Sequence, residues 1–168
     1  MIKQLWLQIL IGVAIVVVAG MAVLAILARA VKKPANLGVH DGKLAPCPPY
    51  PNCVSTQAQD PRHQIAPIRY GGPAATTNSH RRAAEAMAAL LEVLQEMERT
   101  RIAIDEPTYI HAECQTAGMG YIDDVEFYLD ESAQVIHFRS GARLPYWDWN
   151  VNRKRMESIR QAFEAKMR

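Results

Sequence analysis

The chain has 168 residues, 49% of them hydrophobic, and its 19 Lys and Arg residues against 17 Asp and Glu residues give a net charge of +2. Residues 1–33 contain four of the basic residues and no acidic residue, so the rest of the chain has a net charge of −2. This balance argues against a nucleic-acid partner, because phosphate binding needs a cationic surface.

The N-terminal part, residues 1–33, reads as a membrane anchor with a basic collar. A bilayer core about 30 Å thick needs about 20 apolar residues in a helix, and residues 5–28 supply them without a charge. Trp6 occupies the position of an interfacial aromatic residue. A cleaved signal peptide ending at Ala28-Arg29-Ala30 is the alternative, but the apolar run exceeds the usual core of about 7–15 residues. We therefore predict a single-pass protein that contacts the lipid bilayer through residues 5–28.

The charges that flank the apolar run do not decide on which side of the membrane the rest of the chain lies. Lys3 precedes the apolar run, whereas Arg29, Lys32 and Lys33 come after it, and this favours a cytoplasmic C-terminal domain. A single span with a short N-terminal tail nevertheless commonly exports the domain on its C-terminal side, which gives a slight preference for the periplasmic side.

Residues 34–62 are rich in proline and read as a linker. Within this segment, Cys47 and Cys53 are separated by five residues, so a disulfide is sterically possible in an oxidising compartment. Two free thiols are the alternative. A zinc site is least favoured, because C-x5-C is not a usual ligand spacing.

Residues 63–168 are expected to form a globular α+β domain. An extended segment near residues 65–70 precedes a helix at 79–99, whose apolar positions are Ala84, Met87, Leu91, Leu94 and Met97. Strands are expected at 101–105, 109–116, 122–129 and 134–140, and a last helix begins near Asn152, capped by Asp148 or Asn150. The apolar stripe of this last helix consists of Met156, Ile159 and Phe163. Short connections between the strands predict an antiparallel sheet with the helices packed on one face.

Alternation divides the strand residues between two faces of this sheet. The face toward the helices is apolar, with Ile102, Ile104, Ile110, Ala112, Cys114, Val125, Phe127, Leu129, Ile136 and Phe138. The outer face is polar, with Tyr109, His111, Glu113, Asp124, Glu126, Tyr128, His137 and Arg139. Tight turns at Gly118-Met119 and Glu131-Ser132 predict two cross-strand rows on the outer face, His111–Glu126–His137 and Glu113–Asp124–Arg139.

The His111–Glu126–His137 row is a candidate metal site. Two imidazoles and a carboxylate could hold a metal ion with an open position for water, as in a metal-assisted hydrolase. The alternative is an exposed face of mixed charge, whose ion pairs contribute only fractions of a kcal/mol each. The sequence contains no G-x-S-x-G, H-E-x-x-H or phosphate-binding glycine motif, so an enzyme is not favoured and no cofactor is expected.

Aromatic and basic residues cluster between the last strand and the last helix. Exposed aromatic residues on loops often anchor partners, which makes Tyr146, Trp147, Trp149 and Arg153 candidates for binding a membrane-protein partner. The alternative is that the aromatic rings cover the open edge of the core. Arg139, Arg143 and Arg153 are candidates for binding an anion or a lipid headgroup.

Several short blocks occur in a characteristic order along the chain. They are Leu44-Ala45-Pro46-Cys47-Pro48, Pro51-Asn52-Cys53-Val54-Ser55, Asp123-Asp124-Val125-Glu126-Phe127, Arg139-Ser140 and Val151-Asn152-Arg153-Lys154-Arg155. Between about residues 44 and 163 the chain resembles the uncharacterised family known as domain of unknown function 1499. Members are bacterial or chloroplast proteins, often attached to membranes, and the resemblance implies no agreed activity or cofactor. The chain departs from the family pattern where Ala142 replaces a serine and Leu144-Pro145 replaces Val-Gly.

These features together predict a membrane-anchored, non-enzymatic interaction or assembly module. The alternative functions are a metal-assisted hydrolase and a binder of anionic ligands or lipid headgroups that uses the polar face of the sheet.

Overall fold

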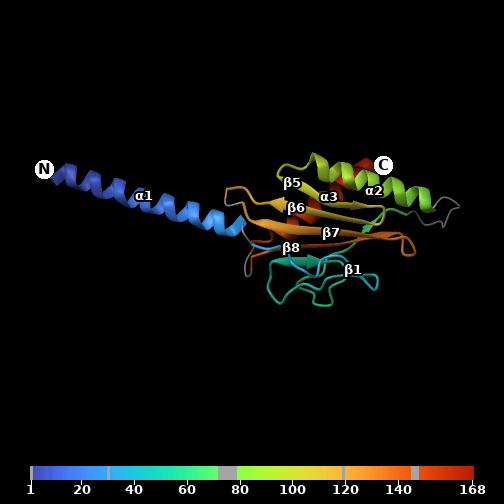
Figure 1. The fold of residues 1–168 in the computed structure, drawn as a ribbon. Helices are drawn as coiled ribbons and strands as arrows, with labels where there is room; N and C mark the ends of the chain where they lie inside the picture. The colour runs from blue at the N-terminus through green and yellow to red at the C-terminus, as the bar shows by residue number, and fades with distance from the viewer. Residues whose placement is uncertain (1, 30, 72–78, 119, 145–147) are drawn as a thin grey trace.

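The structure is a computed structural model that describes residues 2–29, 31–71, 79–118, 120–144 and 148–168. One long helix, α1, projects from a folded unit of short strands, a larger sheet and two helices (Figure 1). The elements are α1 (Ile2–Arg29), β1 (Val39–His40), β2 (Lys43–Leu44), β3 (Cys53–Ser55), β4 (Ile68–Arg69), α2 (Ser79–Glu96), β5 (Thr100–Glu106), β6 (Tyr109–Gln115), β7 (Ile122–Asp130), β8 (Val135–Ala142) and α3 (Val151–Lys166).

Helix α1 is a candidate membrane span. Its segment Ile2–Ile26 is long and apolar enough to cross a membrane, and none of its most apolar window is buried against the folded unit. At 1.5 Å per residue the 28-residue helix is about 42 Å long, which exceeds the thickness of a bilayer core.

The folded unit is α+β, and its strands pair antiparallel as predicted. In the described residues a six-stranded sheet has the order β3-β8-β7-β6-β5, and β4 pairs with the other end of β8. Helices α2 and α3 lie on one face of this sheet (Figure 1). The antiparallel α+β architecture predicted from the sequence is confirmed.

The core lies between the helices and the apolar face of the sheet. Phe127 and Phe138 are fully buried there, with ring centroids 6.3 Å apart. The predicted stripe of α3, Met156, Ile159 and Phe163, is buried against them. The Cys114 thiol is also buried, and burial raises its pKa, so this cysteine behaves as the small core residue that its position predicts.

Two details of the apolar face differ from the prediction. Ile104 pairs with His111 on the outer face because a bulge shifts the register of β5 between Ile102 and Ile104. The buried stripe of α2 is also rotated, so that Ala84 is exposed. Its buried positions are Ala83, Ala86, Met87, Leu90, Val93 and Leu94.

Residues 34–62, predicted as a linker, pack on the sheet. Strand β3 within this segment pairs with β8, with Cys53 opposite Gly141 and Ser55 opposite Arg139. Strands β1 and β2 form a separate two-stranded sheet. A disulfide joins Cys47 to Cys53, which the sequence left open as one of two alternatives.

Candidate functional site

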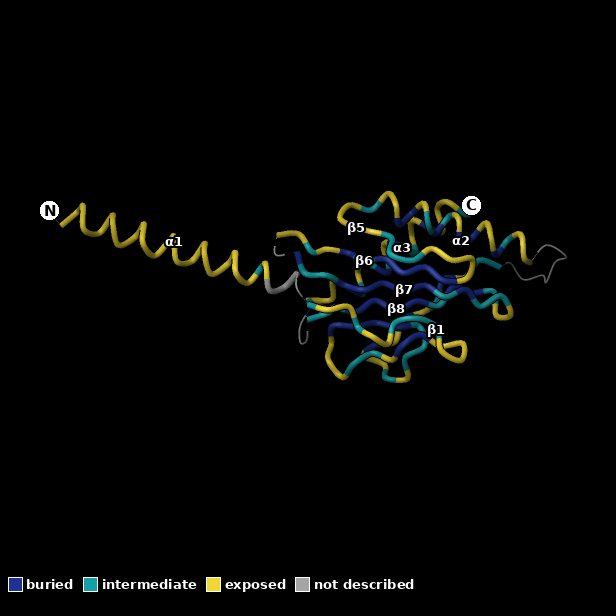
Figure 2. Tube along the Cα trace, viewed as in Figure 1, coloured by how far each residue is buried: buried dark blue, intermediate teal, exposed yellow. Residues whose placement is uncertain are grey.

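The polar face of the sheet is buried. His111, Asp124 and Glu126 are inaccessible to solvent, and Figure 2 shows the central strands as largely buried. The segment after α1 contacts this face. Lys33 Nζ lies 3.4 Å from His111 Nδ1, and Gly38 N donates a hydrogen bond of 2.7 Å to Glu126 Oε1. The alternative considered from the sequence, in which this face is exposed to solvent and carries mixed charge, is therefore wrong.

The register of the polar face is confirmed for one hairpin and wrong for the other. Between β6 and β7, His111 lies opposite Glu126, as predicted. Between β7 and β8 the pairing is shifted by two residues. Arg139 lies opposite Glu126, and His137 lies opposite Tyr128.

The turn between β7 and β8 explains this shift. Asp130 pairs with Val135, so four residues separate the paired ends where two were predicted. Asp130 Oδ1 accepts hydrogen bonds from Ser132 Oγ at 2.6 Å and Ala133 N at 3.0 Å, and Gln134 adopts a left-handed φ of 52°. A longer turn of this kind moves every later pair.

Because of this shift, His137 does not lie opposite Glu126, so the predicted metal site at His111, Glu126 and His137 is not formed as a cross-strand row. His137 Nδ1 lies 3.0 Å from Thr56 Oγ1, and burial lowers the pKa of His137. His111 Nε2 faces Asp124 Oδ1 at 2.9 Å. Over the ranges that the structure describes, no group of three or more His, Cys, Asp and Glu residues is placed to hold a metal ion.

Asp124 is the centre of a buried charge network. Arg143 donates to both of its oxygens, Nε to Oδ2 and Nη2 to Oδ1, each at 2.8 Å, and Arg143 Nη2 also reaches Glu113 Oε1 at 2.6 Å. Burial raises the pKa of Asp124, but hydrogen bonds from Arg143 and His111 outweigh burial and lower this pKa below its ordinary value. Arg143, a predicted anion-binding residue, thus has two carboxylates as partners.

Glu126 forms a second centre beside the first. Tyr109 donates its hydroxyl proton to Glu126 Oε1 at 2.8 Å, and burial together with the charge of Glu126 raises the pKa of Tyr109. Arg139 Nη1 lies 3.4 Å from Glu126 Oε2, near the upper limit for a hydrogen bond. Arg139 Nε is buried without a hydrogen-bond partner in the described part of the chain. Arg139 is therefore much less satisfied than Arg143.

A cavity of about 430 Å³ opens beside Arg139. Its lining contains Arg139, Arg143 and Asn52 and, among the described residues, no Asp or Glu. The Asn52 Oδ1 atom is also buried without a partner in the described residues. Gly141 makes space at this point, because a Cβ there would lie 3.3 Å from both Arg139 Nη2 and Cys53 Sγ. We call this space the Arg139 cavity.

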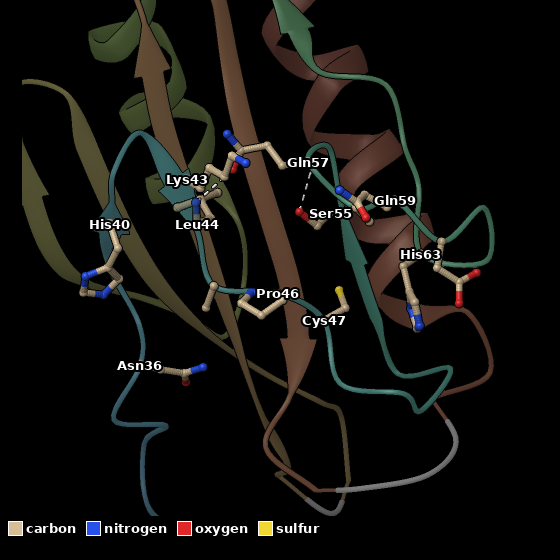
Figure 3. Close-up of a pocket in the computed structure, with 13 residues that line it drawn as sticks. Asn36, His40, Lys43, Leu44, Pro46, Cys47, Ser55, Gln57, Gln59 and His63 are labelled. Carbon is tan, nitrogen blue, oxygen red and sulfur yellow. Dashed lines mark hydrogen bonds between the residues drawn. The ribbon is translucent and has the colours of Figure 1, made fainter.

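Figure 3 shows the residues that line a second cavity, of about 510 Å³. This cavity shares Asn36, Pro46 and Cys47 with the Arg139 cavity. His63 in its lining places Nδ1 at 2.8 Å from the Cys53 carbonyl oxygen, and because a carbonyl only accepts, Nδ1 carries the proton. Asp60 supplies a carboxylate, but hydrogen bonds from Arg62 lower the pKa of Asp60 to about 2. The described lining of this cavity exposes more apolar than polar surface, and its lysine, Lys43, is exposed to solvent, whereas Arg139 is buried.

A polar network on the opposite face ties α3 to the sheet. Arg155 Nη2 donates to Asp123 Oδ2 at 2.6 Å, and Arg155 Nη1 donates to Asn152 Oδ1 at 2.8 Å. Asn152 also accepts a hydrogen bond from Ser140 Oγ and donates through Nδ2 to the Asn52 carbonyl at 3.1 Å. Burial raises the pKa of Asp123 despite its pairing with Arg155.

The aromatic segment before α3 is described in part. Tyr146 and Trp147 lie outside the described residues. Trp149 is 75% exposed. Arg153, predicted to bind a partner or an anion, donates to the carbonyl oxygens of Gln64 and Arg62, each at 3.0 Å.

Residues 43–163 match the family model described as protein of unknown function (DUF1499). The chain belongs to this family. The comparisons with curated proteins and with solved structures gave no match.

In this DUF1499 protein, the blocks that carry the resemblance meet in space. Asn52, Asp123, Ser140, Asn152 and Arg155 come from four of these blocks and form the network behind the sheet. The sequence grouped the residues into blocks, but it did not show that the blocks contact one another. The sequence also did not identify Asn52 as a residue that lines a cavity. The one available indication was that Asn52 directly precedes Cys53.

Proposed function

We propose that the protein is a membrane-anchored, non-enzymatic binding domain that holds the anionic group of a small ligand, a carboxylate or a phosphate, at Arg139. The observation that carries this proposal is the state of the Arg139 side chain. It is 7% exposed, it has an unpartnered Nε in the described structure, and it lines a cavity free of described acidic residues. Buried polar groups are nearly always paired, and an anion in the Arg139 cavity is the further partner that we propose for this guanidinium group.

The chemistry of the guanidinium group supports this ligand class. Its planar set of N–H donors matches a carboxylate or phosphate and forms short, charge-assisted hydrogen bonds with either. Arg143 contributes positive charge at the edge of the cavity while its donors hold Asp124. Arg153 is a weaker candidate, because two backbone carbonyls bind its donors.

A binding role is favoured over catalysis because the acid–base pair of the sheet is inaccessible. His111 and Asp124 have almost no exposed side-chain surface, and Lys33 and Arg143 contact them. A general base must reach a proton on a bound substrate, and this pair has no open position. The hydrolase alternative therefore has no support from the geometry of the described residues.

The ligand proposal is tested by anion-dependent thermal stability. Inorganic phosphate and succinate are titrated into the full-length protein in detergent, with sodium chloride at matched ionic strength as the reference. We expect phosphate, succinate or both to raise the unfolding midpoint, because a ligand at about 100 times its Kd stabilises the folded state by about 2.7 kcal/mol.

Arg139→Gln removes the charge at the site and should abolish this stabilisation. Arg69→Gln is the matched control, because Arg69 is an exposed arginine at the edge of the same sheet and should leave the response intact. The proposal fails if neither anion stabilises the unaltered protein, or if Arg139→Gln responds as the control does.

We further propose that the folded unit lies on the periplasmic side of a bacterial inner membrane. The disulfide between Cys47 and Cys53 supports this placement, since disulfides persist in oxidising compartments and are rare in the cytosol. The buried Cys114 provides an internal reference.

Thiol alkylation in acid-quenched, denatured cells tests this placement. A maleimide that adds mass should label one cysteine before reduction, Cys114, and all three after reduction. Labelling of three cysteines before reduction would contradict a periplasmic location.

A further inference from the structure

The exposed large hydrophobic side chains of the folded unit gather at one end. Among the described residues outside α1 they are Tyr50, Trp149 and Val151. Tyr50 belongs to the disulfide loop, whereas Trp149 and Val151 flank the start of α3. The hydrogen bond from Asn152 to the Asn52 carbonyl joins these two segments. We call this region the Trp149 surface.

The chain leaves for α1 at this same end. Pro34, five residues after the last residue of α1, lines the Arg139 cavity together with Tyr50 and Arg143. Figures 1 and 2 show α1 projecting from the end of the sheet at which β8 finishes. A bilayer spanned by α1 would therefore face the Trp149 surface.

The backbone holds Trp149 outward at a cost. Trp149 and Asn150 both adopt left-handed conformations, with φ of 50° and 61°, and this conformation is unfavourable for a bulky residue such as tryptophan. Asp148 stabilises the turn, since its carboxylate accepts hydrogen bonds from Asn150 N and Asn152 N, each at 3.0 Å. This strained turn keeps a large indole in solvent in the isolated chain.

The chemistry of the region suits a lipid interface. Tryptophan and tyrosine are enriched at the boundary between lipid and water, where the ring is apolar and its polar edge stays hydrated. Two exposed lysines are close in sequence to residues at this end, Lys32 two residues before Pro34 and Lys154 three residues after Val151. Basic residues close to a membrane are attracted to anionic headgroups.

We infer that the Trp149 surface contacts the bilayer in which α1 is anchored, with the Trp149 indole among the lipid headgroups. The contact would orient the folded unit on the membrane and hold the mouth of the Arg139 cavity close to the lipid. The inference rests on the membrane anchoring proposed above and does not depend on a ligand at Arg139.

Quenching of tryptophan fluorescence by brominated lipid tests this contact in the full-length chain. The protein is placed in nanodiscs of phosphatidylcholine and phosphatidylglycerol whose acyl chains carry bromine close to the headgroup. Trp6→Phe with Trp147→Phe leaves Trp149 as the sole tryptophan of the three. We expect brominated lipid to lower its fluorescence relative to unbrominated lipid.

The matched control carries its reporter at the other end of the sheet. Tyr70 N donates a hydrogen bond to the carbonyl oxygen of Gln134, the residue just before β8. The start of β8 lies about 23 Å from its end, because the strand has eight residues. Tyr70→Trp, in a chain whose native tryptophans are all replaced by phenylalanine, should keep its fluorescence in brominated lipid.

Two further variants separate the possible failures. The chain that retains only Trp6 reports on anchoring, and Trp149→Phe in the otherwise native chain shows the Trp149 contribution without altering Trp147. Quenching of Trp6 with none at Trp149 would overturn the contact and leave the anchor intact. Unquenched Trp6 would overturn both.

Discussion

Arg143→Met is expected to lower the free energy of unfolding by about 3–5 kcal/mol, the usual cost of removing one partner from a buried ion pair. The side chains of Arg143 and Asp124 are 7% and 1% exposed, and the arginine holds both carboxylate oxygens. Methionine keeps much of the apolar stem but leaves Asp124 charged and buried with His111 as its remaining described partner. Chemical denaturation of the full-length protein in detergent measures the loss.

Arg101→Met is the matched control for this experiment. Arg101 and Arg143 both bind Glu113, one at each carboxylate oxygen, but the Arg101 side chain is 68% exposed. Exposed ion pairs contribute about 0–1 kcal/mol, so this variant should lose little stability. Equal losses in the two variants would show that burial of the network has no energetic consequence.

The stability difference between Arg143→Met and the unaltered protein should also depend on pH. A carboxyl group whose pKa is lowered by folding stabilises the protein above its unfolded pKa, and this contribution disappears as the pH falls through the folded pKa. Asp124 behaves in this way because of Arg143 and His111. Without Arg143 the pKa of Asp124 rises, so the buried carboxylate is protonated and neutralised at a higher pH than in the unaltered protein. The difference should therefore shrink as the pH falls toward and below the ordinary pKa of an aspartate, about 3.9, and a constant difference would contradict the assignment.

Arg155→Met is expected to have a comparable effect, a loss of about 3–5 kcal/mol, through the network on the opposite face. Arg155 and Asp123 are 10% and 3% exposed, and the arginine connects α3 to the sheet. Its removal also takes a donor from Asn152. Lys154→Met is the control, since Lys154 is exposed and surface substitutions of this kind change stability by less than about 0.5 kcal/mol.

A double-mutant cycle identifies the Arg155–Asp123 pair as the source of this loss. Asp123→Asn removes the charge that Arg155→Met leaves buried, so the double variant should lose less stability than the two single variants added together. The expected coupling is about 0.5–3 kcal/mol. Additive losses would mean that Arg155 acts through contacts other than Asp123.

Local sequence patterns were sufficient for the elements of the folded unit. Alternating apolar residues predicted β6, β7 and β8 within one or two residues of their ends, and the spacing of Met156, Ile159 and Phe163 predicted the buried stripe of α3. These patterns work because side-chain direction in a strand or helix repeats with a fixed period. The turn at Asp130 and the bulge in β5 interrupt that period, so the predicted pairing of β7 with β8 and the predicted face of Ile104 were wrong.

The candidate site was less predictable than the fold. Arg139 was named from the sequence as an anion-binding candidate, but Arg143 and Arg153 had the same standing. Their partners distinguish them: Arg143 is held by Asp124 and Arg153 by backbone carbonyls, whereas Arg139 Nε has no partner among the described residues. Such partners come from segments distant in sequence, and composition or spacing does not identify them.

The sequence by itself determined the apolar helix α1, the antiparallel α+β class, the family, and the apolar face of the sheet, because each of these depends on local composition, periodicity or short motifs. The tertiary structure decided that the polar face is buried, that Arg139 replaces His137 opposite Glu126, and that the disulfide loop lies beside a cavity. The physical reason is that the segment after α1 folds back over the sheet, and contacts such as that of Gly38 with Glu126 join residues far apart in the chain.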